Sequence, residues 1–174
     1  ACEYFNVEKD VDIYMGTFSK SLGSIGGFIS AKSSVAEYIR HKASAFIFTA
    51  ALPPASVAGV IAGLHILADD GERRNRLHEN TAYVKRAFFD MGIQVNNNQV
   101  PIVPIQIGDE ALTLYMNRLL FDDGVFAGVA VSPVVPPLKA MIRTSYTCEH
   151  TQEDLDQVLG SFKKNMKQLG VFPQ

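Results

Sequence analysis

The chain has 174 residues with 16 basic and 18 acidic side chains, so its net charge is −2 and nothing favours nucleic acid or an anionic membrane surface as a partner. Its length suits one domain, or one domain plus a piece of another. Cys2 and Cys148 are far apart without metal-ligand spacing, so we predict a reducing, cytoplasmic setting, no disulfide and no metal site. We expect neither a signal peptide nor a transmembrane segment, which needs roughly 20 apolar residues.

The first element is a short apolar strand at residues 11–15 that leads into a loop of glycines and hydroxyls around Lys20. An amine forms a Schiff base only when it is deprotonated, which desolvation favours. The hydroxyls of Thr17 and Ser19, with backbone N–H groups of the turn, can surround a phosphate while Lys20 reaches an aldehyde. These residues indicate pyridoxal phosphate. A solvated lysine in a tight turn explains the spacing equally well.

The rest of the first part continues the strand with helices. We predict a return strand at residues 27–31 and a helix at 33–41 that begins with a serine cap. After Leu52 and two prolines, an alanine-rich helix at 55–68 follows, with apolar residues broad enough to pack on both sides and His65 partly buried.

The second part alternates helices and strands. We predict a long amphipathic helix at residues 72–91, whose solvated side carries Arg73, Arg74, Arg76, Lys85 and Arg86. The elements after it are a strand at 102–108, a helix at 110–121, strands at 125–131 and 141–147, and a helix at 152–169. Pro104 favours an edge strand or a bulge, and Thr151 with Asp154 forms an approximate capping box. This order predicts a small α/β layer with helices on one face.

Three strings resemble segments of the α-oxoamine synthases, which are pyridoxal-phosphate enzymes. Residues 12–30 read DIYMGTFSKSLGSIGGFIS and resemble the segment of the cofactor lysine. Residues 46–54 read FIFTAALPP and resemble the family's F-[ST]-x-[ST]-L-P-P segment. Residues 132–151 read SPVVPPLKAMIRTSYTCEHT and resemble its P-x-V-P…R-x-[ST]…A-x-H-T segment. The three matches keep the family's order and spacing over most of the chain.

The resemblance implies an α/β fold. Residues 1–70 would be the C-terminal piece of the large cofactor-binding domain, 71–91 a linking helix, and 92–174 a small C-terminal domain with a mainly antiparallel sheet. The family's ring-stacking histidine, its aspartate on the pyridine nitrogen and its N-terminal phosphate loop all precede the cofactor lysine. Since only 19 residues precede Lys20, we expect the C-terminal part of a protein roughly twice as long, inactive on its own.

The resemblance also assigns residues. Lys20 is implied as the catalytic residue, and Thr17, Ser19, Lys20 and Thr49 as cofactor-binding, with Thr49 reaching a neighbouring subunit's phosphate in a homodimer. Arg143 is implied to hold the amino acid's carboxylate, which suits a bidentate guanidinium. The competing interpretations are a core-facing threonine and an arginine paired with a surface acid.

The sequence also departs from the family's motifs. Ala51 stands where the family often has serine, and Cys148 and Glu149 stand where it often has small residues. His150 occupies the motif's histidine, for which we predict a structural role at the start of the last helix.

The implied activity is the decarboxylative condensation of a small amino acid with an acyl-CoA to give an aminoketone. Lys20 would hold the cofactor and then accept the Cα proton. The string DDGVFAGVAVSPVVPP resembles the serine palmitoyltransferase branch slightly more than the glycine acetyltransferase or 8-amino-7-oxononanoate synthase branches. The alternatives are a class I/II aminotransferase and a non-catalytic dimerisation module.

Overall fold

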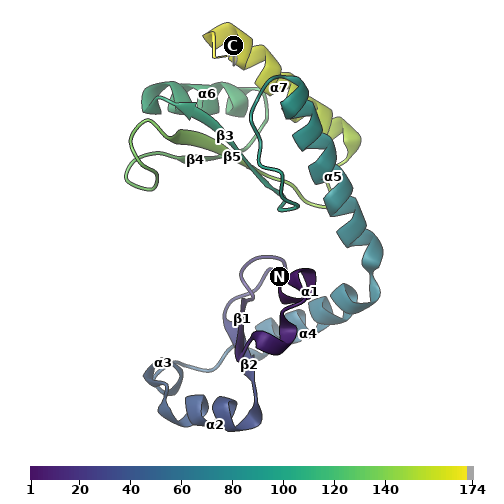
Figure 1. Cartoon of the computed structure of the whole chain (residues 1–174), viewed down its shortest axis with the longest axis vertical. Coiled ribbons are helices and arrows are strands. Elements are labelled where there is room, and N and C mark those ends of the chain that lie inside the picture. Colours follow the sequence, from purple (N-terminus) through teal and green to yellow (C-terminus); the bar gives the residue numbers. More distant parts are fainter. Residues whose placement is uncertain (172–174) are drawn as a thin grey trace. The chain divides into compact units, whose positions relative to one another are not determined.

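The computed structural model describes residues 1–171, and contacts along the chain divide it into two compact units. Unit 1 is Ala1–Asp70, purple to blue in Figure 1, and unit 2 is Gly71–Gln174, teal to yellow. Each is an α/β body, in agreement with the predicted fold class. No helix within residues 1–171 is long and apolar enough to cross a membrane.

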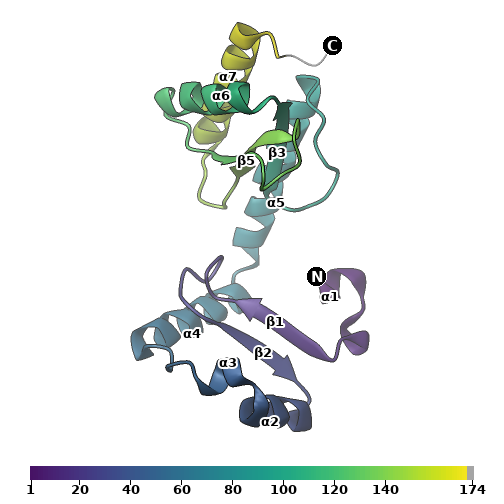
Figure 2. The ribbon, with the colours of Figure 1, turned by 90° about the vertical axis from the view of Figure 1, so that its left-hand side faces the viewer.

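Unit 1 is built on a two-stranded hairpin, which Figure 2 shows with its helices. The strands run antiparallel from the Ile13↔Ala31 pair to the Thr17↔Gly27 pair, as predicted for the return strand. Its elements are α1 (Cys2–Phe5), the 3₁₀ helix η1 (Glu8–Asp10), β1 (Ile13–Thr17), β2 (Gly27–Ala31), α2 (Ser33–Lys42), α3 (Ser44–Ile47) and α4 (Pro54–Asp69).

Three expectations for the helices of unit 1 are wrong. The N-cap of α2 is Lys32 rather than a serine, and it makes no side-chain cap bond. The helix α4 begins at Pro54, where a missing N–H costs nothing, but it is not packed on both sides. Val60, at 5% exposed, is the only buried hydrophobic side chain of this unit within residues 1–70, and His65 is exposed. Unit 1 therefore lacks a closed core.

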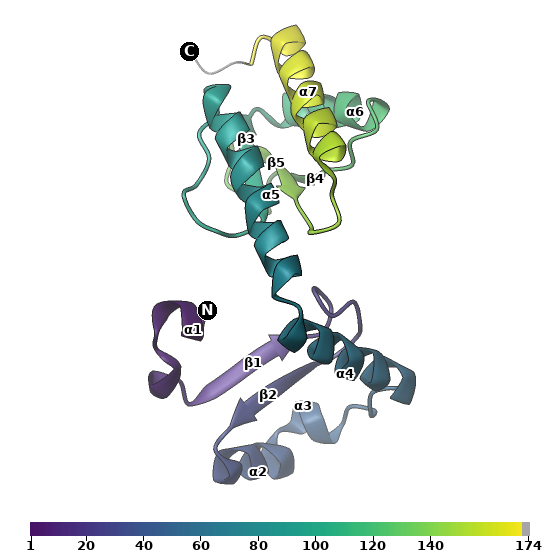
Figure 3. The same cartoon turned by 90° about the vertical axis from the view of Figure 1, so that its right-hand side faces the viewer.

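Unit 2 contains a three-stranded antiparallel sheet in the order β3-β5-β4. Its elements are α5 (Gly71–Asp90), β3 (Ile102–Gly108), α6 (Glu110–Asp122), β4 (Gly128–Ala130), β5 (Ala140–Ser145) and α7 (Gln152–Leu169). Figure 3 shows α5 and α7 side by side, and the two helices are in contact. Pro104 lies on an edge strand, as one of its two predicted positions requires, and it pairs in register with Arg143. The irregularity of β3 lies further along, between Gln106 and Gly108, so Pro104 is not at a bulge.

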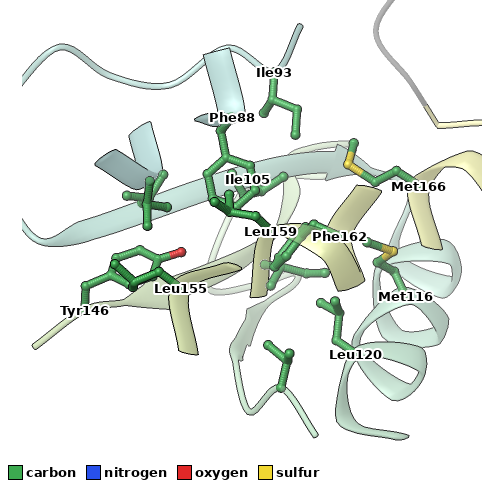
Figure 4. Packing of buried hydrophobic residues seen from close by; sticks show 14 residues of the cluster. Phe88, Ile93, Ile105, Met116, Leu120, Tyr146, Leu155, Leu159, Phe162 and Met166 are labelled. Carbon is green, nitrogen blue, oxygen red and sulfur yellow. The ribbon is translucent and has the colours of Figure 1, made fainter. Parts of the chain in front are cut away.

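The core of unit 2 lies on one face of this sheet. Alternate residues of β3 and β5 are buried, and the helices supply the other side of the packing, as Figure 4 shows. Phe88 of α5 and Phe162 of α7 meet edge to face with ring centroids 5.1 Å apart. Burying each such ring stabilises the fold by roughly 1.5–3 kcal/mol. Because β5 alternates, Arg143 points to the opposite, open face.

Local details of unit 2 confirm one expectation and overturn two. The capping box of α7 is present, since Thr151 Oγ1 accepts the Asp154 N–H at 3.2 Å and Asp154 Oδ2 accepts the Thr151 N–H at 2.8 Å. Lys85 is not solvated, because it is 9% exposed and its Nζ donates to Asn96 Oδ1 at 3.0 Å and Asn98 Oδ1 at 2.9 Å. Burial lowers the pKa of Lys85. The strand predicted at residues 125–131 is shorter in the structure, because the residues of this stretch that pair with β5 are Gly128–Ala130.

Candidate functional site

Lys20 lies at the tip of the loop that joins β1 to β2. The loop closes on itself through backbone hydrogen bonds, with the Phe18 N–H donating to Gly26 O at 2.9 Å and the Ser24 N–H to Phe18 O at 2.8 Å. The Gly23 N–H donates to Lys20 O at 3.0 Å, which folds the chain back immediately after the lysine. These bonds hold the backbone of Lys20 and leave its side chain outside the turn.

Two glycines close the base of this loop. Gly26 has a φ of +91°, and a Cβ there would lie 2.5 Å from the Leu52 side chain. A Cβ on Gly27 would lie 2.6 Å from the carbonyl oxygen of Gly16 on the paired strand. The positive φ therefore favours glycine at position 26, and the close approach of the paired strand backbone requires it at position 27.

The loop is also attached to α4. Ser24 Oγ donates to the carbonyl oxygen of Ser56 in the first turn of α4 at 3.4 Å. The Leu22 side chain lies 3.0 Å from where Gly63 of α4 would carry a Cβ. The small residue on α4 therefore lets the loop pack against the helix.

The hydroxyls next to the lysine converge. Thr17 Oγ1 and Ser19 Oγ are 2.8 Å apart, and the Ser19 N–H donates to Thr17 Oγ1 at 3.2 Å. Both residues are exposed, so the hydroxyls are accessible to a ligand. Hydroxyl and backbone N–H groups gathered in this way are suited to the oxygens of a phosphate.

Lys20 itself is exposed, and within residues 1–171 its amine has no hydrogen-bond or ion-pair partner. An accessible amine beside two accessible hydroxyls fits a cofactor that carries both an aldehyde and a phosphate. The desolvated surroundings that we expected for this lysine are not provided by unit 1.

Thr49 follows α3 and is also exposed. Its hydroxyl donates to the carbonyl oxygen of Ala45 one turn earlier, so it is not the core-facing threonine of the competing interpretation. No hydrogen bond joins Thr49 to the lysine loop within the described part of the chain.

Arg143 lies on β5, the central strand of unit 2, opposite Pro104 of β3 and Gly128 of β4. It is exposed on the open face of the sheet, and within residues 1–171 its guanidinium makes no ion pair or hydrogen bond. The competing interpretation, in which Arg143 pairs with a surface acid, is therefore not supported within the described residues. Five unused N–H donors are suited to a carboxylate. Thr17, Ser19 and Lys20 are brought together in unit 1, whereas Arg143 belongs to unit 2.

The loop after β5 is held by residues that include one the sequence did not reveal. His150 Nδ1 accepts the Thr147 N–H at 3.0 Å, so the neutral ring carries its proton on Nε2. Asn80 of α5 donates from Nδ2 to Thr147 O at 3.0 Å and to His150 O at 3.1 Å. The histidine therefore has a structural role, in the loop that leads into α7. Asn80 carries no sequence signal, because its partners lie 67 and 70 residues away.

Comparison with known sequences supports the three motifs. The family described as aminotransferase class I and II matches residues 1–162. The 8-amino-7-oxononanoate synthase of Thermoanaerobacter pseudethanolicus is 39% identical over 171 residues, covering 98% of this chain and 43% of the relative. The serine palmitoyltransferase of Bacteroides thetaiotaomicron is 38% identical over 170 residues, again covering 98% of this chain and 43% of the relative. The chain thus spans less than half the length of these relatives.

Solved structures agree in fold. Serine palmitoyltransferase from Sphingomonas wittichii superposes with a TM-score of 0.94 at 32% identity, covering 99% of this chain and 44% of that one. A structure described as SPT with a PLP internal aldimine superposes with a TM-score of 0.93 at 31% identity, covering 98% of this chain and 43% of that one. The chain therefore belongs to the aminotransferase class I and II family, and the resemblance to the α-oxoamine synthases that its three motifs predicted is confirmed.

Proposed function

We propose that the protein containing this chain is a pyridoxal-phosphate-dependent acyl-CoA:amino acid C-acyltransferase, which condenses a small amino acid with an acyl-CoA and releases carbon dioxide to give an aminoketone. The observation that carries the proposal is the lysine loop, where an accessible amine stands beside two converging hydroxyls. The names of the two relatives, a synthase and an acyltransferase, support the same reaction. We further propose that the protein is a homodimer. We also propose a cytoplasmic location, with which the two free cysteines are compatible.

Each residue has a definite task in this proposal. The Lys20 amine would hold the cofactor aldehyde, while the Thr17 and Ser19 hydroxyls, and Thr49 from a neighbouring subunit, would donate to its phosphate. When bound, pyridoxal phosphate supplies an electron sink for the negative charge that develops at Cα. The Arg143 guanidinium grips the substrate carboxylate with two parallel hydrogen bonds and fixes the orientation of Cα. The Lys20 amine, when free, would accept the Cα proton as a general base.

Within this reaction class we keep a slight preference for the serine palmitoyltransferase branch. The two relatives differ by one percentage point in identity, 39% against 38%, which favours neither branch. The preference rests on the string DDGVFAGVAVSPVVPP at residues 122–137.

The lysine assignment is tested by cofactor labelling. The chain is titrated with pyridoxal phosphate, reduced with borohydride and digested, and the labelled peptide is identified by mass spectrometry. We expect the label on Lys20 and its loss in Lys20→Ala. Lys32→Ala is the matched control, since Lys32 is an exposed lysine of the same unit at the end of the paired strand.

The outcomes separate the proposals. Equal labelling of Lys20 and Lys32 in both this chain and the longest natural form of the protein would contradict the cofactor site. Specific labelling in the longer form alone would mean that residues outside this chain complete the pocket, which agrees with the expected inactivity of this chain alone.

A class I/II aminotransferase is the second candidate, because the matching family carries that description. Product analysis with and without acyl-CoA decides between the two. Release of free CoA and carbon dioxide supports the acyltransferase, whereas an oxo acid formed without acyl-CoA supports the aminotransferase. Self-association without either product would instead favour the dimerisation module.

A further inference from the structure

The open face of the unit 2 sheet carries a single charged side chain among the residues of its three strands. The register places Ile102, Pro104, Gln106, Gly128, Ala130, Met141, Arg143 and Ser145 on this face. Arg143 is central, with the Pro104 ring on one side and Gly128 on the other. On this face β4 presents only Gly128 and Ala130. The side chains of β4 therefore rise less far above the sheet than those of β3 do.

The Arg143 side chain lies on the β4 side of the face. A Cβ built on Gly128 would lie 3.8 Å from Arg143 Nε and 4.0 Å from Arg143 Nη2, so the guanidinium lies against the bare backbone of β4. Gly128 is not among the residues of the described chain with a positive φ, so the backbone itself does not require glycine there. A Cβ alone would make ordinary contacts with the arginine, whereas the atoms beyond Cβ of a larger side chain would extend into the space that the guanidinium occupies.

We infer that Gly128 is a positioning residue for Arg143, which fixes the direction in which the guanidinium presents its N–H donors to the carboxylate of an α-amino acid. The inference rests on the proposed function. Directly opposed residues of antiparallel strands have Cβ atoms about 4.5–5.5 Å apart, so a branched side chain at position 128 occupies the space of the guanidinium. A bidentate pair depends on geometry, and a small displacement of the fork removes one of its two hydrogen bonds.

The test compares Gly128→Val with Ala130→Val. Both add a branched side chain to the same face of the same strand, but Ala130 lies opposite Met141 instead of Arg143. The first readout is the Nε–Hε NMR resonance of Arg143 in this chain, identified by its absence in Arg143→Lys. The second is the dissociation constant of the amino acid from the cofactor-loaded protein in its longest natural form, measured by spectral titration.

We expect Gly128→Val to shift the Arg143 resonance and to weaken amino-acid binding about ten- to a hundredfold, the effect of losing one charge-assisted hydrogen bond. Ala130→Val should leave the resonance in place and the affinity within about twofold. Gly128→Ala should shift the resonance less than Gly128→Val does. Because its Cβ contacts of 3.6 to 4.0 Å would be ordinary ones, this variant is expected to fold, and it takes the place of the valine variant in the test if that variant does not fold.

An unshifted resonance in Gly128→Val, or an equal loss of affinity in Ala130→Val, would overturn the inference. Unchanged amino-acid binding in Arg143→Lys would remove the carboxylate role of Arg143, and the inference with it. Intact binding without condensation would contradict the acyltransferase proposal alone and support the role of Gly128.

Discussion

At the scale of single residues, Tyr146 is a buried polar group without a partner. The side chain is 5% exposed and packs edge to face against His150, and within residues 1–171 its hydroxyl makes no hydrogen bond. The nearby Thr144 hydroxyl donates to Val103 O at 3.0 Å, and although it lies close enough to offset part of the rise in the pKa of Tyr146, the two hydroxyls form no hydrogen bond of ordinary geometry. An unsatisfied buried hydroxyl costs about 1–3 kcal/mol. Tyr146→Phe is therefore expected to raise the free energy of unfolding at pH 7 by about 1 kcal/mol, measured by urea denaturation.

The same variant should change the alkaline limit of stability. Burial raises the pKa of Tyr146 to about 12 from 10.0. Because the pKa is higher in the folded than in the unfolded protein, the unfolded state loses this proton first. The stability of the unchanged protein is therefore unaffected by this group below pH 10 and falls as the pH rises towards 12. The stability difference between Tyr146→Phe and the unchanged protein should therefore widen across that interval. Thr144→Val, which loses a bond that is made, should be less stable by about 1 kcal/mol, and a similar loss in Tyr146→Phe would show that the hydroxyl is bonded.

Particular residues show how far the sequence could lead. Lys20, Thr17 and Ser19 were predicted because they are neighbours in the chain, and the structure keeps them together. Gly128 and Asn80 were not, because their partners Arg143 and His150 are brought to them only by strand register and helix packing. Lys85 was assigned to solvent from helical periodicity alone, which cannot reveal asparagine oxygens supplied by a later loop.

At the scale of elements, Asp123 joins the end of α6 to α7. Its carboxylate accepts from Ser161 Oγ at 2.7 Å, Asn165 Nδ2 at 2.8 Å and Lys164 Nζ at 2.5 Å. These bonds, that of Lys164 above all, lower the pKa of Asp123 from 3.8 to about 2. We expect Asp123→Asn to lower the unfolding temperature at pH 7, because the neutral amide pairs less well with Lys164.

The pH dependence gives this prediction its direction. A carboxylate with a lowered folded-state pKa stabilises the protein above its unfolded value of 3.8, and that contribution disappears as the pH falls to about 2. The unfolding temperatures of Asp123→Asn and the unchanged protein should therefore converge over this interval. Asp122→Asn is the matched control, since within residues 1–171 the neighbouring Asp122 side chain pairs with the exposed Arg118 alone, and such exposed pairs contribute little. A constant difference at every pH would contradict the assignment.

The elements were better predicted than their surroundings. The bounds of β2, β3 and α7 agree with the sequence because each has clear periodicity and clear end signals. The prediction that α4 is packed on both sides was wrong. A broad apolar surface shows that a helix needs packing partners, but it does not show that those partners belong to the same 70 residues.

At the scale of the whole molecule, the two units differ in how completely they bury their apolar side chains. Unit 2 encloses a cluster of buried side chains from three helices and two strands. Unit 1 rests on a two-stranded sheet and leaves Phe46, Phe48, Ile61 and Leu64 exposed, and a two-stranded sheet without a covering layer is marginally stable in water.

Hydrogen exchange should therefore divide the chain at Asp70. We expect backbone amides of β3, β5 and α7 to exchange only through global opening of unit 2, and those of β1, β2 and α4 to exchange through local openings, by orders of magnitude faster. Mass spectrometry of exchanged peptides measures both sets in one sample, so the unit 2 peptides serve as the internal control. Adding pyridoxal phosphate should slow exchange in the peptide that contains Lys20 while leaving β3 and β5 unchanged, because a ligand stabilises only the state that binds it. Equal protection of the two units without cofactor would mean that unit 1 closes its apolar surface by itself, for instance by self-association, and the protection would then fall on dilution.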